Sequence, residues 1–411
     1  MKFFFPDSLD AIDPGYDFSQ ERHSSTRVRL RTDRFAHEVL PRSPYDGLLL
    51  SLNMVENAQG NQRYTEAQRH RLRREGVHTF FRLRNANGRL LEAMGDCGAF
   101  AYVKEETPPF TVEQVLDFYA DLRFDYVLSI DHVIPGHLSS GRRRKRPPTS
   151  WRRRQEITLT LARDFLHEHR KRKLTSVPIG VVQGWDARSY TYAAAELQKM
   201  GYNYIALGGL AALPVEIGLE IVHAINTVRH PSTRLHLLGV SPLSYFSEFA
   251  QAGVFSFDTT SPLRQAFLSA RDNYHTLWGA TYPALRVPQV TGNATLRKRI
   301  QLGHLSSAHV KRLEKACMEG LRAFDAGRIS LAEVLEALVT YEALFNGRDH
   351  RDCYRKTLEE RPWERCPCPL CKELGIEIML LRGLERNKRR GFHNLYVFAH
   401  QLNKIQAHHV H

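Results

Sequence analysis

The 411-residue chain has few cysteines and no long apolar run. No stretch of about 18 consecutive apolar residues occurs, so the sequence predicts no membrane-spanning helix. The opening residues, MKFFFPDSLD, carry an apolar patch too short for a secretory signal. The six cysteines, three of them within six residues, therefore indicate reduced, metal-binding thiols in a cytoplasmic protein rather than a disulfide framework.

Acidic residues are also fewer than basic ones. Lys and Arg number 58 against 44 Asp and Glu, a formal charge of +14. This excess suits a polyanionic partner, although proteins that never touch nucleic acid can carry it too. With 42% hydrophobic and 25% charged residues the composition is globular, and the length allows one large α/β domain with an appendage or two ordinary domains.

Short apolar runs alternate with amphipathic helical patterns between about residues 47 and 273. This alternation is typical of a parallel sheet covered by helices, and eight strand candidates fit a (β/α)8 TIM barrel. The segment between the second and third apolar runs is too short to form a full helix. A doubly wound sheet is therefore the alternative. The expected strands are 47–55, 77–83, 98–104, 126–133, 177–184, 204–211, 235–241 and 254–260, and the expected helices include 111–122, 150–169, 188–200, 214–228 and 244–253.

The β pattern stops after about residue 290. Residues 301–346 are rich in Leu, Ala, Glu, Lys and Arg at helical spacing and predict paired helices. We therefore expect three parts: an N-terminal leader (1–46) packing on the barrel, a catalytic barrel (47–290), and a C-terminal helical zinc-binding subdomain (291–411).

Polar residues and glycines gather where the expected strands meet their loops. In VFSFDTTSPL the apolar run ends on Asp258 just before a helix-like segment, and a lone carboxylate there is usually a helix cap. Several such strand ends in succession are hard to explain as caps, because in a barrel they converge on one mouth, where such enzymes place their chemistry. The candidates are Asp96 just ahead of the third run, Asp131, Gln183, Gly208, Gly209 and Asp258.

A basic segment, GRRRKRPPTSWRRR (141–154), follows the Asp131 strand end. A basic run is often only a solvated loop or a helix start. At the mouth of a barrel it is also well placed to hold phosphates, and we favour this role over a solvated loop. The residues expected to bind nucleic acid are Arg142, Arg143, Arg144 and Lys145.

A metal constellation lies near the C-terminus. Cys366, Cys368 and Cys371 have the spacing C-x-C-x2-C, and His393 follows twenty-two positions after the last of them. Three sulfur ligands and one nitrogen select Zn²⁺, and four protein ligands make the site structural. The histidine is the weaker assignment, because His400 lies two helical turns further on.

Taken together, these motifs resemble the tRNA-guanine transglycosylases. The resemblance rests on Asp-Cys-Gly-Ala-Phe at 96–100, strand-ending Asp131, Val-Val-Gln-Gly, Leu-Gly-Gly-Leu, Leu-Leu-Gly-Val, Phe-Asp at 257–258 and C-x-C-x2-C…His, and it covers the chain from about Met94. Members of this family are zinc-containing (β/α)8 barrels that exchange guanine for a 7-deazaguanine.

The resemblance also implies residue roles. Asp258 matches the nucleophile that forms a covalent glycosyl-enzyme, and Asp96 matches the general acid/base. Asp131 matches the carboxylate that accepts hydrogen bonds from the guanine edge, with the Gln183 amide and the Gly209 N–H donating to O6. Gly208 and Gly209 let the base approach the backbone closely.

Two differences from the tRNA enzymes concern whether the substrate is DNA or tRNA. Asp258 is followed by Thr-Thr-Ser-Pro-Leu-Arg-Gln, with Arg264 the only basic residue, and the family's Gly-Gly-Phe-Gln reads Gly-Ala-Phe-Ala at 98–101. The pattern resembles the branch that inserts 7-deazaguanines into DNA, which implies DNA and 7-cyano-7-deazaguanine (preQ0) as substrates and co-encoded proteins as partners. A tRNA transglycosylase stays open as the alternative. A non-catalytic nucleic-acid-binding subunit is disfavoured, because Asp96 and Asp258 are both present.

Overall fold

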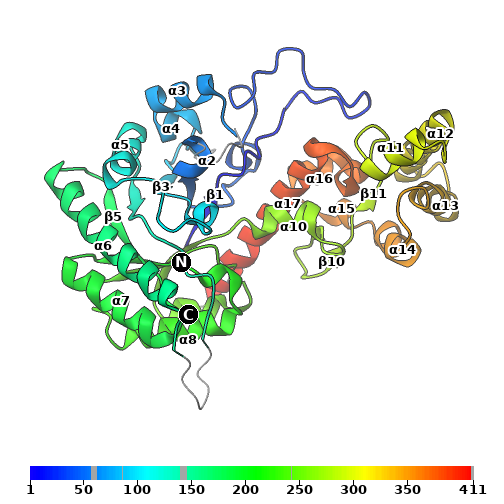
Figure 1. Ribbon diagram of the computed structural model, residues 1–411. Helices are drawn as coiled ribbons and strands as arrows, with labels where there is room; N and C mark the ends of the chain where they lie inside the picture. Colours follow the sequence, from blue (N-terminus) through cyan, green and yellow to red (C-terminus); the bar gives the residue numbers. More distant parts are fainter. Residues whose placement is uncertain (57–62, 86, 139–145, 242, 409–411) are drawn as a thin grey trace. The chain divides into compact units, whose positions relative to one another are not determined.

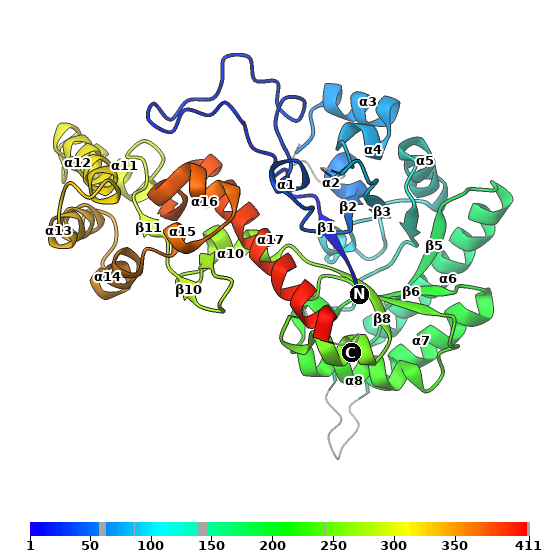
Figure 2. The same cartoon turned by 180° about the vertical axis from the view of Figure 1, so that it is seen from behind.

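The computed structural model describes residues 1–56, 63–85, 87–138, 146–241 and 243–408, and the chain divides into two compact units (Figures 1 and 2). The first unit comprises residues 1–9, 45–260 and 404–411, and the second comprises 10–44 and 261–403. Residues 142–145, for which phosphate contacts are expected, lie outside the described residues.

The first unit is a closed barrel of eight parallel strands. β1 pairs with both β2 and β8, which closes the sheet and excludes the doubly wound alternative. The strands are β1 (Lys2–Pro6), β2 (Gly47–Ser51), β3 (Glu92–Asp96), β4 (Tyr126–Leu128), β5 (Val177–Val182), β6 (Tyr204–Leu207), β7 (Arg234–Leu237) and β8 (Val254–Asp258).

Helices cover the outside of the barrel, as expected for a (β/α)8 fold (Figure 1). The five expected helices are confirmed within a few residues at each end. Their amphipathic pattern and caps explain this agreement; Thr111, for example, accepts the N–H of Gln114 at the start of α5. The helices are α2 (Leu52–Glu56), α3 (Glu66–Glu75), α4 (Val77–Phe80), α5 (Val112–Leu122), α6 (Thr149–Lys171), α7 (Ala187–Met200), α8 (Val215–Asn226) and α9 (Phe246–Gln251).

Two expected strands are wrong. Residues 77–83 contain helix α4, and residues 98–104 contain a 3-10 helix, η1 (Ala99–Tyr102), that follows Gly98 with its left-handed φ of 84°. The true first and third strands are KFFFP, inside the segment expected to be a leader, and EAMGD, which lacks β-branched and aromatic residues. Asp96 consequently ends a strand instead of preceding one.

Side chains fill the inside of the barrel, so it is a packed core and not a pore. Alternate residues of the strands point inward, and Phe4, Met94, Tyr126 and Tyr204 belong to one fully or nearly fully buried cluster there. This packing fixes the strand ends that carry the polar groups described below.

The second unit is mostly helical. Buried Arg382, just before α17, and Arg386 on α17 form ion pairs with Glu21 of the N-terminal segment, at 2.5 and 2.7 Å. Burial opposes ionisation of Glu21, but the hydrogen bond and charge of Arg382 outweigh it and lower its pKa to about 2. The elements are α1 (Ala36–Val39), α10 (Ser261–Leu268), β9 (Tyr274–His275), β10 (Thr281–Tyr282), β11 (Leu285–Arg286), α11 (Ala294–Gln301), α12 (Ser307–Asp325), α13 (Leu331–Glu342), α14 (Arg351–Glu360), α15 (Pro362–Arg365), α16 (Pro369–Leu374), β12 (Leu380–Leu381) and α17 (Gly383–His408), whose residues 404–408 belong to the first unit.

Candidate active site and metal centre

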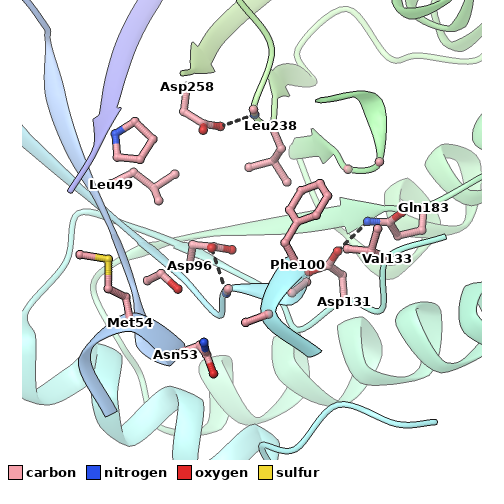
Figure 3. A pocket seen from close by; sticks show the side chains of 18 of the residues that line it. Leu49, Asn53, Met54, Asp96, Phe100, Asp131, Val133, Gln183, Leu238 and Asp258 are labelled. Carbon is pink, nitrogen blue, oxygen red and sulfur yellow. Dashed lines mark hydrogen bonds between the residues drawn. The ribbon is translucent and has the colours of Figure 1, made fainter. Parts of the chain in front are cut away.

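One cavity of about 450 Å³ lies at the carboxyl ends of the barrel strands (Figure 3). The parallel strands bring together residues that are up to 252 positions apart in the chain, from Pro6 to Asp258. The cavity is lined by all six residues expected from the strand ends, namely Asp96, Asp131, Gln183, Gly208, Gly209 and Asp258.

Asp258 ends β8 and is 6% exposed. Its Oδ1 atom accepts two hydrogen bonds, from the backbone N–H of Gly239 at 3.0 Å and from Nε2 of His236 at 3.1 Å. His236 itself is fully buried on β7 and does not line the cavity. The carboxylate is therefore held from the side away from the cavity. Sequence reasoning missed His236.

Asp96 ends β3 and faces the same cavity. Its Oδ2 accepts the backbone N–H of Gly98 at 2.9 Å. Burial, followed by the negative charges of Asp131 and Asp258, raises its pKa to about 7. A carboxyl group with this pKa can both give and take a proton near neutral pH.

Asp131 and Gln183 are hydrogen-bonded to each other on the opposite wall. Gln183 Nε2 donates to Asp131 Oδ2 at 2.6 Å, and its Oε1 accepts the N–H of Ile134 at 3.2 Å. Burial raises the pKa of Asp131 to about 6, although the hydrogen bonds from Gln183 and Cys97 act in the opposite direction. At neutral pH Asp131 is therefore an ionised acceptor.

Cys97 supports Asp131 from behind. Its Sγ lies 3.5 Å from Asp131 Oδ1, and the Tyr102 hydroxyl lies 3.0 Å from Cys97 Sγ and 3.2 Å from the Asp131 carbonyl oxygen. Burial raises the pKa of the Cys97 thiol well above its usual value, so it stays a protonated donor. No sequence pattern indicated a role for Cys97.

Gly208 and Gly209 give the cavity a backbone wall next to Gln183. A Cβ at Gly208 would lie 2.2 Å from Gln183 Nε2, and Gly209 has a left-handed φ of 78°. Larger residues would displace the amide or strain the turn. The rest of the lining is partly apolar, and the Phe100 ring, 55% exposed, stands between Leu238 and Asp131 in Figure 3.

The last basic residues of the 141–154 segment differ in what they contact. Arg154 donates to the carbonyl oxygens of Val133 and Val103, at 2.5 and 2.7 Å, and so braces the loop after β4. Arg152 and Arg153, near the start of α6, are exposed.

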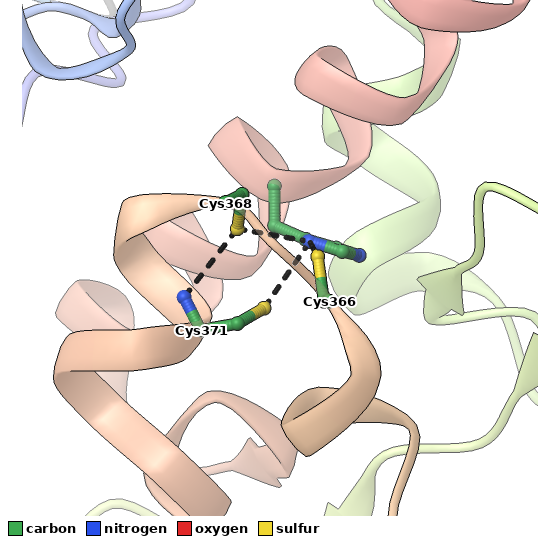
Figure 4. A group of neighbouring side chains, drawn as sticks. Cys366, Cys368 and Cys371 are labelled. Carbon is green, nitrogen blue, oxygen red and sulfur yellow. Dashed lines mark hydrogen bonds between the residues drawn. The ribbon is translucent and has the colours of Figure 1, made fainter.

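The four expected metal ligands come together in the second unit (Figure 4). Ligand atoms of Cys366, Cys368, Cys371 and His393 all lie within 4.8 Å of one another, and the four residues are buried. His393 Nδ1 is 3.3–3.5 Å from the three sulfur atoms. This cluster could hold one metal ion with four protein ligands.

The surroundings of His393 favour metal ligation. Its Nε2 lies 2.7 Å from the carbonyl oxygen of His275, which requires a proton on Nε2 and leaves Nδ1 free for a metal. The Tyr274 ring stacks on the imidazole with centroids 3.9 Å apart. The residues therefore fit a soft divalent ion such as Zn²⁺.

Comparisons with known proteins identify the family of the chain. Residues 50–282 match the family model described as queuine tRNA-ribosyltransferase. The chain is 42% identical to a DNA-guanine transglycosylase of Salmonella montevideo, over 98% of this chain and 96% of that protein. It is also 26% identical to a queuine tRNA-ribosyltransferase of Methylacidiphilum infernorum (isolate V4), over 38% of this chain and 42% of that protein. Within the described ranges, no helix combines the length and apolar character needed to cross a membrane.

Proposed function

This chain belongs to the queuine tRNA-ribosyltransferase family and is a glycosyltransferase of the base-exchange class, and we propose that it exchanges guanine in DNA for the 7-deazaguanine preQ0. The observation that supports DNA as the substrate is the similarity to a DNA-guanine transglycosylase over nearly the full length of both chains. The match to the tRNA enzyme covers less than half of either chain. The proposal includes action in the cytoplasm, together with other proteins of a DNA-modification system.

In the first half-reaction Asp258 is the nucleophile. An electron pair of its carboxylate forms a bond to C1′ of the target nucleotide, and the bond from C1′ to guanine N9 breaks with its electrons on the base. Asp96, with a pKa of about 7, supplies the proton that neutralises the departing guanine. The product is a covalent glycosyl ester, as in retaining glycosidases.

In the second half-reaction preQ0 occupies the place that guanine left. Its N9 attacks C1′ from the same face while Asp96, now ionised, takes the N9 proton. The ester bond breaks, and its electrons return to the Asp258 carboxylate. Two inversions retain the β configuration, and no ATP is needed because one glycosidic bond replaces another.

Asp131 and Gln183 select the base by hydrogen-bond pattern. Asp131 accepts from the adjacent N1–H and 2-amino group of guanine. Gln183 Nε2 uses one N–H for Asp131 and keeps its second for O6, where the Gly209 N–H joins it. Adenine presents the wrong groups at each contact, and each buried group left unpaired costs about 1–3 kcal/mol. A guanine in a duplex must leave the stack to reach this cavity.

The Cys366, Cys368, Cys371 and His393 set would hold Zn²⁺ as a structural ion. A bound zinc would contribute folding free energy by tying the loop that begins at Cys366 to α17. The residues that line the cavity all belong to the first unit.

The phosphate-binding role of Arg142, Arg143, Arg144 and Lys145 is part of the same proposal. A tRNA substrate is the second candidate, because the matching family model is described by a tRNA activity.

Purified protein incubated with labelled preQ0 and either duplex DNA, single-stranded DNA or tRNA decides between the polymers. We expect label in DNA. Label in tRNA alone would overturn the DNA assignment and leave base exchange standing.

A further inference from the structure

We propose that His236 is a positioning residue for the nucleophile, holding Asp258 so that Oδ1 faces the protein and Oδ2 attacks C1′. The inference rests on the proposed role of Asp258 as the nucleophile, and it applies to DNA and tRNA substrates alike. His236 does not line the cavity, so it acts through Asp258 and not on the substrate.

A chain of hydrogen bonds runs through the barrel interior to the carboxylate. Tyr204 Oη lies 2.5 Å from Ser256 Oγ, Ser256 Oγ lies 2.6 Å from His236 Nδ1, and His236 Nε2 lies 3.1 Å from Asp258 Oδ1. Tyr204, His236 and Ser256 are at most 1% exposed. Bulk water therefore does not reach these hydrogen bonds.

The fold places these groups by register and alternation. His236 of β7 and Ser256 of β8 are paired in the parallel ladder. Ser256 and Asp258 are two residues apart on one strand, so they point to the same face. His236 therefore touches both of them from the neighbouring strand.

Only one arrangement of protons gives every donor in this series of hydrogen bonds an acceptor. The ionised Asp258 carboxylate accepts only, so His236 must carry its proton on Nε2. If Nδ1 accepts the Ser256 hydroxyl proton, Ser256 can in turn accept the proton of Tyr204, and every donor has an acceptor. A doubly protonated ring would donate Nδ1–H to Ser256 Oγ, and one of the two hydroxyl protons of Ser256 and Tyr204 would then have no acceptor within this set of hydrogen bonds. His236 is accordingly the neutral Nε2–H tautomer.

This tautomer makes the two oxygens of Asp258 unequal. Oδ1 takes two donors, the Gly239 N–H and His236 Nε2–H, whereas Oδ2 has no hydrogen-bond partner among the described residues. Oδ2 is therefore the attacking atom. In the glycosyl ester Oδ1 becomes the carbonyl oxygen and keeps both donors. When the ester bond breaks, the same donors stabilise the charge that returns to the carboxylate.

Rates of the two half-reactions test the proposal in the full-length protein. His236→Phe removes both ring nitrogens with similar shape, whereas His236→Gln keeps a donor able to reach Oδ1. We expect His236→Phe to slow exchange roughly 10- to 100-fold. Its KM for the incoming base should change less than about twofold, since His236 touches no substrate. The second half-reaction should slow more than the first, so the covalent adduct should accumulate, and His236→Gln should reverse both effects.

Ser256→Ala tests the same hydrogen bonds without changing His236, so the proposal stays testable if a histidine variant fails to fold. Losing the proton that fixes the tautomer should slow exchange roughly 2- to 10-fold without lowering zinc content. Wild-type rates in Ser256→Ala or His236→Phe would overturn the role of His236, as would equal slowing by Phe and Gln with an unchanged adduct fraction. A wild-type protein that forms no adduct at Asp258 would instead overturn the proposed mechanism itself.

Discussion

Gln183 and Asp131, the two side chains that we expect to read guanine, are hydrogen-bonded to each other at 2.6 Å. The bond fixes the Gln183 amide with Nε2 toward Asp131, and the N–H of Ile134 on Oε1 fixes its other end. It also opposes the rise in the Asp131 pKa that burial causes. The pair thus works as one preorganised recognition unit.

Gln183→Leu should therefore have two effects. Loss of the donor to O6 should lower kcat/KM roughly 10- to 100-fold. Loss of the bond to Asp131 should raise the pKa of that carboxyl further, so activity should begin to fall at a higher pH on the acidic side. Gln198→Leu, on α7 and outside the cavity, is the matched control. A variant with unchanged kcat/KM would contradict the role of Gln183.

The pH dependence follows from two raised carboxyl pKa values. Asp131, with a pKa of about 6, must be ionised to accept from guanine, so activity should fall below about pH 6. Asp96, with a pKa of about 7, must be protonated to release guanine, so activity should fall above about pH 7. A profile of kcat/KM should be bell-shaped between these values, which belong to the coupled group of carboxylates.

Asp131→Asn tests the cause of the alkaline limb. Burial is the largest cause of the raised Asp96 pKa, and the charge of Asp131 comes next. Removing that charge should move the alkaline limb to lower pH in whatever activity remains. A limb that stays in place would show that Asp96 does not set it.

Asp258→Asn should abolish exchange and leave the fold and metal content unchanged, because it removes the nucleophilic charge with little change in volume. Trapping of a covalent protein–nucleic acid adduct is the measurement. Asp7→Asn is the matched control, since Asp7 is a buried carboxyl just after β1 that bonds Tyr64 and does not line the cavity. An active Asp258→Asn variant would remove Asp258 from the mechanism.

Five barrel helices and the strand-end residues could be predicted from the sequence, whereas two of the eight strands and helix α4 could not. Helical periodicity and caps are local signals, and a polar residue that ends a buried strand stands out. β3, with the sequence EAMGD, carries no local strand signal; its strand state comes from pairing with β2 and β4. The apolar run at 77–83 gives no period that separates helix from strand.

His236 is a site residue that could not be predicted from the sequence. Its role depends on the lateral register between β7 and β8, which no local pattern specifies. The available signal was the alternation Ser256-Phe257-Asp258, which places a polar side chain in a buried strand on the same face as a catalytic candidate. A buried polar residue needs a partner, and the neighbouring strand is where to look for it.

Cys368→Ser should lose zinc and lower the melting temperature. The three sulfurs and His393 Nδ1 are the only groups of this kind that converge within the described part of the chain. Each kcal/mol of lost stability should lower the melting temperature by about 2–4 °C for a unit of this size. Cys353→Ser, outside the cluster, is the control. Stoichiometric zinc in Cys368→Ser would show that the ligand set is wrong.

The basic segment should contribute affinity without sequence selectivity. Neutralising Arg142, Arg143, Arg144 and Lys145 together should weaken binding to every DNA sequence alike. It should also flatten the dependence of log affinity on log salt by roughly 0.7–0.9 units per lost phosphate contact. Selectivity for guanine should not change, because Asp131 and Gln183 set it inside the cavity.

The control for this last prediction is a set of four exposed cations at the opposite end of the barrel. The helices run antiparallel to the strands, so the C-terminal ends of α6 and α7 lie away from the cavity mouth. Neutralising these residues changes the net charge equally but should leave the salt slope unchanged. Equal slopes for the two variants would mean that 142–145 form only a solvated loop. The control residues are Arg170, Lys171, Lys173 and Lys199.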